Sequence, residues 1–450
     1  MTPVPAPRTA IEIVHAVGSG ELSPVNVARE HLERIAALDQ RVGAFEAVRS
    51  REVLAEADAL AARSDLAGLP LAGVPVAVKD NLPIAGEVPG HGHPAARSVP
   101  AEKDHEVVGR LRAAGALIVG RTRMPQLAIW GTSDCPCGIA RNPWDLRRSA
   151  GGSSGGSAAA VVAGMVPVAV GNDGMGSVRV PAASCGAFGI KPGRGLVPSK
   201  LGPSSWMGMA ENGAIATTVA DTALLLSVMA GTPDLATVVP ECASLRIAVS
   251  TKSPLIGVRV GGHHKEVATA VADLLRWLGH SVRAFDPPYS VATASAVVAW
   301  WTAGVAEAAT DVPRDMLERR ARGHVAVGRL VRRRGWAKPK QRDDWRRRSE
   351  EYFADIDVLL TPALASPPPS AGPWCRRSWP ANLVSNANFA PFAAPWNFAG
   401  YPAAAVPAGM DPRGTPIAVQ LVAPVGAEAT ILRLAAQIEK ARPWTRLAPL

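Results

Sequence analysis

Apolar residues recur along this chain with two different periods, and each period predicts a different kind of element. After Ser23-Pro24, a pair suited to the N-cap and first turn of a helix, apolar residues return at helical spacing. We expect a second helix from Phe45 to about Arg63. Short unbroken apolar runs are typical of buried strands instead, and three of them predict strands at Val74–Val78, Ala116–Gly120 and Val166–Val170.

Amphipathic segments alternate with these apolar runs. This alternation of strand and helix is typical of an α/β domain. We find no internal repeat and no linker, so one domain over residues 1–450 is the simpler interpretation. Further helices are expected at Glu106–Gly115, Thr218–Ala230 and Ala429–Ala441, and a further strand from Asp357. The domain divides into a helical segment (about 1–65), a core (about 70–230), an Arg-rich helical region (about 290–355) and the remaining core (356–450).

The composition predicts a folded chain with a basic surface. Hydrophobic residues make up 48% of the 450 residues, which excludes a disordered or linker protein. The net charge of +10 is concentrated in an Arg-rich segment, residues 317–348, that has no interleaved aromatic repeats. We therefore predict a solvated helical face and no binding of nucleic acid. The alternative is that this segment docks an acidic partner, such as an acyl carrier protein bearing the substrate.

The cysteines and the N-terminal sequence predict a cytoplasmic protein. Five cysteines, at positions 135, 137, 185, 242 and 375, are an odd set in a long chain without a secretory signal, so we expect no disulfide framework. Cys135-Pro-Cys137 is not a CxxC redox motif and is expected only to pack. The most apolar stretch, Ala158–Val170, contains Gly and Pro and is too short to span a bilayer, so no membrane association is predicted.

Lys79 is the first candidate for chemistry, because it ends the apolar run that includes Val76 and Val78. A lysine buried against these residues would lose solvation, and its pKa would fall toward neutrality. The neutral amine could then accept a proton, as an activating base must. Taken alone, a surface lysine that ends a strand is the simpler interpretation.

Two Gly/Ser-rich loops are the other candidates. Gly151–Ser157 (GGSSGGS) could cradle a phosphate, hold a reactive serine or serve as a linker, although the apolar helix predicted after it argues against a linker. Gly171–Ser177 (GNDGMGS) follows a predicted strand, where α/β proteins place ligands, and its N–H groups could hold an oxyanion while a serine attacks a carbonyl. Its spacing differs from the G-x-G-x-x-G of dinucleotide-binding loops.

Together these features resemble the amidase signature family. The central stretch GGSSGGSAAAVVAGMVPVAVGNDGMGSVRVPA is similar to the family's Gly-Gly-Ser-Ser-Gly-Gly-Ser loop, Ala-rich helix and Gly-x-Asp-x-Gly-Gly-Ser-Ile-Arg-x-Pro-Ala motif. Further matches are GVPVAVKDN, RLRAAGALIVGRTRMPQ and RNPWD before this stretch, and DVLLTPA, NFAGYPAAAVPAG and GTPIAVQLV after it. The resemblance covers nearly the whole chain. It implies a single large α/β domain with a central mixed, twisted β-sheet flanked by α-helices.

The resemblance also implies a Ser-cisSer-Lys triad. Ser177 matches the nucleophile, Ser153 the bridging serine whose peptide bond is cis, and Lys79 the base. The backbone N–H groups that match the oxyanion hole belong to Gly174, Met175, Gly176 and Ser177. No metal and no organic cofactor is implied.

Other residues are expected to support this triad. Asp173 and Arg179 flank the nucleophile and are predicted to pair, and Ser154 is predicted to hydrogen-bond within the site without joining the proton relay. The residues expected at the substrate pocket are Ile129, Trp130 and Met175. Met175 departs from the family, which has glycine there, and would store roughly 1–2 kcal/mol of strain if the position needs a positive φ.

The function implied is hydrolysis of a small or medium carboxamide, in a biosynthetic or catabolic pathway, by a monomer or homodimer. One alternative is a glutamine-dependent transamidase subunit that amidates mischarged tRNA together with partner subunits. Another is a family member that has lost turnover and acts as a binding protein. His91-Gly-His93 offers two metal ligands, but the others that a site needs are not evident, so we interpret it as a turn.

Overall fold

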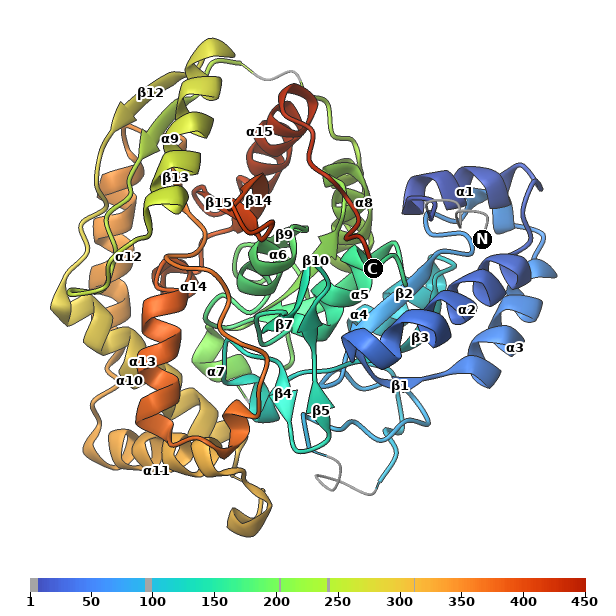
Figure 1. Ribbon diagram of the computed structural model, residues 1–450, viewed down its shortest axis with the longest axis horizontal. Helices are drawn as coiled ribbons and strands as arrows, with labels where there is room; N and C mark the ends of the chain where they lie inside the picture. Colours follow the sequence, from blue (N-terminus) through green and yellow to red (C-terminus); the bar gives the residue numbers. More distant parts are fainter. Residues whose placement is uncertain (1–6, 94–98, 202–203, 241–242, 311) are drawn as a thin grey trace.

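An eleven-stranded mixed sheet organises the chain (Figure 1). The structure is a computed structural model that describes residues 7–93, 99–201, 204–240, 243–310 and 312–450. In their order across the sheet, the strands are β1 (Phe45–Val48), β3 (Leu117–Thr122), β2 (Pro75–Lys79), β8 (Val168–Asp173), β10 (Glu211–Ala216), β9 (Phe188–Lys191), β14 (Ala403–Met410), β15 (Pro416–Val422), β13 (Val358–Pro362), β11 (Arg246–Val249) and β12 (Ser281–Ala284).

The middle of the sheet brings the two candidate loops to one edge. β2 lies between β3 and β8 and runs parallel to both, so the carboxyl ends of the three strands meet at the same edge. Lys79 ends β2 and Asp173 ends β8. The Val166–Val170 strand predicted from the sequence therefore runs three residues further, and it carries the start of the second Gly-rich loop to this edge.

Helices cover both faces of the sheet and form an additional layer beside it (Figure 1). The helices are α1 (Ala10–Gly18), α2 (Pro24–Val42), α3 (Ser50–Ala61), α4 (Glu106–Ala113), α5 (Gly155–Val162), α6 (Arg179–Cys185), α7 (Ser205–Gly208), α8 (Val219–Ala230), α9 (Gly262–Trp277), α10 (Val291–Ala308), α11 (Arg319–Arg334), α12 (Pro339–Phe353), α13 (Trp379–Phe389), α14 (Ala394–Ala399) and α15 (Glu428–Ala441). None of them, within the ranges described, is long and apolar enough to cross a bilayer.

The sheet has a separate core on each face, because successive side chains of a strand point to opposite sides. Val76 and Val78 pack into the core that includes residues of α4, α8 and α15. Ala77, between them, packs with α2, α3 and α5. A third core, rich in tryptophan, joins α10, α11, α12 and α14. The single α/β domain expected from the sequence is thus confirmed, with the sheet flanked by helices.

The helix expected after Ser23-Pro24 is confirmed, and the Ser23 side chain caps it by accepting from the N–H of Asn26 at 3.2 Å. The helix expected from Phe45 to about Arg63 is wrong at its start. Phe45–Val48 is the edge strand β1, which pairs antiparallel with β3, and the helix α3 begins only at Ser50. Pairing with β3 and burial of Phe45 override the local helical pattern there.

The prediction that the Arg-rich segment is a solvated face is wrong for part of it. Arg320 is completely buried and forms ion pairs with Asp134 (3.1 Å) and Glu318 (2.6 Å). Arg342 is also buried, and it donates to three backbone carbonyls, including that of Phe398 at 2.7 Å. Several arginines of the same helices do remain exposed: Arg319, Arg322, Arg329, Arg332, Arg333, Arg334 and Arg347.

Close packing of α10 on α11 predicts one stability effect. An added Cβ on Gly328 of α11 would lie 1.9 Å from the carbonyl oxygen of Thr302 in α10. We expect Gly328→Ala to lower the free energy of unfolding by about 1–3 kcal/mol, because the two helices must move apart. The gain in helix propensity, about 1 kcal/mol, would act in the opposite direction.

Urea denaturation would measure this difference. Gly372→Ala is the matched control, because a Cβ there meets no atom within 4 Å, and it should leave the midpoint nearly unchanged. A Gly328→Ala protein as stable as the parent would contradict the prediction.

Candidate active site

Lys79 is fully buried at the carboxyl end of β2. Its Nζ donates to Ser153 Oγ at 2.7 Å and to Asn172 Oδ1 at 2.7 Å. Burial lowers the pKa of Lys79 well below its usual value, although the Asp173 carboxylate acts in the opposite direction. The amine is therefore suited to accept a proton rather than to act as a fixed positive charge.

Ser153 lies in the first Gly/Ser loop, just before α5. The Gly152–Ser153 peptide bond is cis. The hydroxyl of Ser133 donates to the carbonyl of Ser153 at 3.1 Å and accepts from the N–H of Gly155 at 2.9 Å, so it holds the loop from behind. Position 152 requires glycine because a Cβ would lie 2.6 Å from the carbonyl oxygen of Trp130. The loop is thus fixed by neighbours that leave no room for a different path.

Ser177 lies in the second loop, between β8 and α6, and only 6% of its surface is exposed. Its carbonyl accepts from the N–H of Ser154 at 3.1 Å, which joins this loop directly to the first one. The Ser154 hydroxyl also bonds to the backbone of Asn172, with contacts of 3.3 Å to both its carbonyl and its N–H. The structure therefore brings Lys79, Ser153 and Ser177 together at one edge of the sheet.

Asp173 and Arg179 form a buried ion pair that spans the Ser177 loop. The Arg179 Nε donates to Asp173 Oδ2 at 2.9 Å, and its Nη2 donates to Asp173 Oδ1 at 3.0 Å. Burial alone would raise the pKa of Asp173, but the guanidinium of Arg179 outweighs it and holds that pKa well below its usual range. The carboxylate stays ionised and also accepts from the N–H of Gly176 (2.6 Å) and of Val178 (3.2 Å), which fixes the path of the loop.

The backbone N–H groups at 174–177 are not equivalent. That of Gly176 already donates to Asp173, whereas those of Gly174, Met175 and Ser177 have no hydrogen-bond partner among the described residues. The concern that Met175 needs a positive φ is wrong. Gly176 takes the left-handed conformation, with φ at 115°, and Met175 does not. The glycine that the turn requires is therefore still present, one residue further along.

Sequence reasoning missed several residues that hold this site. Asn172 accepts from Lys79 and donates to Asn81 Oδ1 at 2.7 Å, and its place beside Asp173 in the second loop could have indicated it. Asn397 and Gln420 accept from Arg179 at 2.5 and 2.7 Å. Both lie more than two hundred residues away from Arg179 in the chain, so no local pattern indicated them.

Two cavities meet at Ser177. The first, which we call the apolar cavity, has a volume of about 110 Å³ and has no charged side chain among its described wall residues. Its wall includes Ile129, Trp130, Met175, Tyr289, Val297 and Trp301. The second, which we call the polar cavity, has a volume of about 600 Å³. Its wall includes Asn81, His91, Ser153, Asn172, Lys200 and Trp206.

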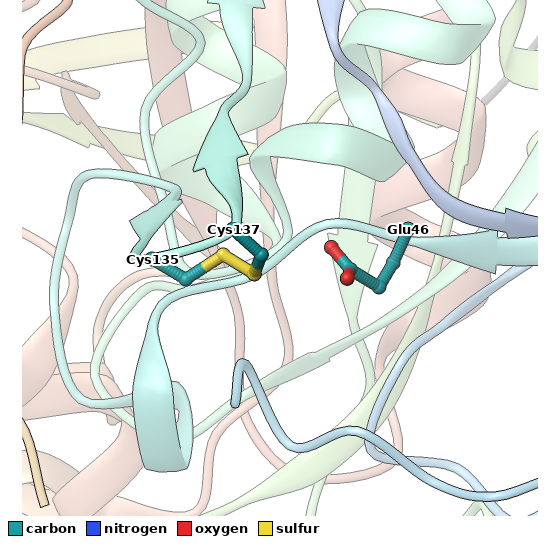
Figure 2. A group of neighbouring side chains, drawn as sticks. All are labelled: Glu46, Cys135 and Cys137. Atoms are coloured by element: carbon teal, nitrogen blue, oxygen red, sulfur yellow. A yellow bond between two sulfur atoms is a disulfide. The ribbon is translucent and has the colours of Figure 1, made fainter. Parts of the chain in front are cut away.

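Figure 2 shows Glu46, Cys135 and Cys137, a group of potential metal ligands among the described residues. Their ligand atoms all lie within 4.8 Å of one another. The two cysteines form a disulfide, so the expectation that they only pack is wrong. The tight turn between β4 (Asp134–Cys135) and β5 (Gly138–Ile139) brings their Cα atoms to 5.2 Å, within reach of a disulfide.

This group does not fit a metal in its present form. Both sulfurs are used by the disulfide, and Arg123 pairs with Glu46 at 2.9 Å and contacts Cys135 Sγ at 3.6 Å. His91 and His93 lie in a turn closed by a 2.8 Å bond from the N–H of His93 to the carbonyl of Gly90. Cys185 and Cys375 are buried free thiols, and Cys242 lies outside the described residues.

Comparisons with known proteins agree on one family. The Amidase family model matches residues 26–432. A putative amidase, AmiB2, from Mycobacterium tuberculosis is 40% identical over 443 residues, covering 96% of both chains. An acylamidase from Rhodococcus erythropolis is 32% identical over 477 residues, covering 98% of this chain and 97% of the relative. The structure of 6-aminohexanoate cyclic dimer hydrolase with substrate aligns with a TM-score of 0.87 at 29% identity, covering 98% of each chain.

The buried ion pair predicts a large effect on stability. Arg179→Gln would leave the Asp173 carboxylate buried without its cation, and we expect the free energy of unfolding to fall by about 3–5 kcal/mol. The matched control is Arg147→Gln, which breaks an ion pair to Asp145 that leaves 91% of the arginine side chain exposed. That change should leave the free energy of unfolding nearly unchanged. Chemical denaturation of both variants would measure the difference, and equal losses would contradict the prediction.

Proposed function

Because this chain belongs to the amidase signature family and is a hydrolase of amide bonds, we propose that Ser177 attacks the substrate with Ser153 and Lys79 as its proton relay. The single observation that carries this proposal is the 2.7 Å contact from the buried amine of Lys79 to the hydroxyl of Ser153. A desolvated lysine beside a serine hydroxyl, itself beside a second serine loop, is the arrangement that activates a hydroxyl nucleophile.

The reaction proceeds in two halves. Lys79 draws a proton through Ser153 as the Ser177 oxygen attacks the amide carbonyl, and the proton then passes through Ser153 to the leaving nitrogen. The carbon–nitrogen bond breaks and leaves an ester on Ser177. Water hydrolyses this ester by the same relay and releases the acid. The chemistry described uses the groups of this chain and water.

Backbone N–H groups stabilise the negative charge that develops on the carbonyl oxygen. Of the four predicted from the sequence, Gly174, Met175 and Ser177 are the proposed donors, because the N–H of Gly176 already bonds to Asp173. Each such donor is worth about 3 kcal/mol of transition-state stabilisation. Asp173 and Arg179 act as positioning residues, since they hold the loop that presents these donors, and Ser154 ties that loop to the first one.

The substrate is a small or medium carboxamide whose pocket includes Ile129, Trp130 and Met175. The apolar cavity argues against the transamidase alternative, because none of its described wall residues carries a charge to hold the ammonium and carboxylate groups of glutamine. The alternative of a binding protein without turnover is separated by labelling. Modification by a fluorophosphonate that depends on Ser177 supports the hydrolase, and a folded protein that resists labelling supports the alternative.

An acidic carrier protein is a second proposal for how the substrate arrives. The exposed arginines near the end of α11, Arg329, Arg332, Arg333 and Arg334, form no ion pair among the described residues. Binding of an acidic carrier that is lost when these arginines are changed to glutamine would support it. A monomer or homodimer and a cytoplasmic location stay predictions. The Cys135–Cys137 disulfide counts against the cytoplasm, because disulfides are rare in that reducing compartment.

Substitution of the triad tests the mechanism. Ser177→Ala should abolish amide turnover and fluorophosphonate labelling, and Ser153→Ala or Lys79→Met should lower kcat by about 10²–10⁴. Ser157→Ala is the matched control, because this serine of the same loop bonds to Thr122 (2.7 Å) and the carbonyl of Val170 (3.1 Å) and not to Lys79. Turnover that survives in Ser177→Ala would refute the proposal.

The acidity of Lys79 predicts a pH dependence. Only the neutral amine accepts the proton, so kcat/KM should fall as the pH drops through the lowered pKa of Lys79. The Asn172 side-chain oxygen accepts from this amine and so favours its charged form. Asn172→Leu removes this acceptor and should lower the pKa of Lys79 further, so the acid limb should move to lower pH. A pH–rate profile of both proteins would measure the shift, and a limb displaced to higher pH would count against Lys79 as the base.

A further inference from the structure

The two cavities differ in which members of the proposed triad they reach. Ser177 lies on the wall of both. Ser153 and Asn172 line only the polar cavity, whereas Gly152 and Met175 line only the apolar cavity. The nucleophile therefore stands between two spaces of different chemistry, and the relay serine faces only one of them.

Proton delivery decides which half of the substrate enters which space. The leaving nitrogen must come within hydrogen-bond reach of Ser153, because that hydroxyl returns the proton in the proposed mechanism. The nitrogen must then point into the polar cavity, and the acyl group into the apolar cavity on the other side of Ser177. This step rests on the proposed function.

From these observations we propose that the enzyme is selective for amides of a neutral aromatic acyl group, and that Met175 limits the width of that group. The apolar cavity has a volume of about 110 Å³, which is of the order of a cavity that takes one aromatic ring. Its aromatic wall, which includes Trp130, Tyr289 and Trp301, suits rings in edge or offset contact. A charged acyl group would be desolvated there without a counter-ion.

Met175 is placed to limit the width of the acyl group. It adjoins the nucleophile loop, its side chain is partly buried, and it lines the apolar cavity together with Ile129 and Val180. Its backbone is not in the left-handed region, so the residue can be replaced without changing the path of the turn, which depends on Gly176. The thioether is flexible and packs well against aromatic rings. Removing it would widen the cavity beside the reacting carbonyl.

A series of primary amides tests the acyl preference, because each releases ammonia and the polar cavity meets the same leaving group. We expect kcat/KM for phenylacetamide to exceed that for hexanamide, because the ring gains edge or offset contacts with the aromatic wall. Both should exceed the anionic succinamate by at least about a hundredfold. A preference for succinamate, or for hexanamide over phenylacetamide, would overturn the proposal.

Matched variants assign the limit on width to Met175. Met175→Gly should raise the ratio of 2-naphthylacetamide to phenylacetamide by about tenfold, while Met175→Leu, of similar volume, should leave it within about threefold. An unchanged ratio in Met175→Gly would overturn the role of Met175.

Failure of this inference can be told from failure of the proposed function. If turnover depends on Ser177 but the acyl ranking differs from that expected, only the inference fails. If none of the amides is turned over, protection of Ser177 from fluorophosphonate labelling by the same amides gives the ranking, and equal protection by all of them would overturn it. If Ser177 is not labelled, quenching of tryptophan fluorescence by the amides ranks their binding, and a lack of difference between aryl amides and succinamate would overturn it.

Discussion

The burial of one lysine amine is the constraint on which this active site depends. Lys79 is completely buried at the end of a strand that lies between two parallel neighbours, and its amine donates to Ser153 and Asn172. Desolvation favours the neutral form, which is the form that can take a proton. The same burial would be costly for a lysine that had to stay charged, so the fold and the chemistry require the same state of this residue.

A buried ion pair between Asp173 and Arg179 is the second feature that holds the site. The Ser177 loop folds around the Asp173 carboxylate, which must stay ionised to accept from its backbone, and Arg179 supplies the opposite charge. Arg179 in turn needs acceptors for its remaining N–H groups and finds them on Asn397 and Gln420. Residues from distant parts of the chain thus meet at one guanidinium, and loss of that group would leave several buried polar partners unsatisfied.

Sequence reasoning succeeded where the determinants are local and failed where they are not. Short local patterns predict the strand that carries Lys79 and the helix capped by Ser23, and the structure has both. Phe45 was assigned to a helix because its pairing with Thr122 is a contact between distant segments. Arg320 was taken for a surface residue because its partner Asp134 lies far away in the chain. Charge alone does not reveal whether an arginine is solvated or neutralised inside the protein.

Two requirements of the Ser177 loop, a residue with positive φ and a set of free backbone N–H groups, can both be met without a glycine at position 175. The turn needs one residue with a left-handed backbone, and Gly176 meets that need with its φ of 115°. The oxyanion needs N–H groups, which any residue other than proline supplies. Neither requirement restricts the side chain at 175, so methionine can enter the apolar cavity without altering the backbone that does the chemistry. Substrate choice can therefore vary at this position while the catalytic geometry stays fixed.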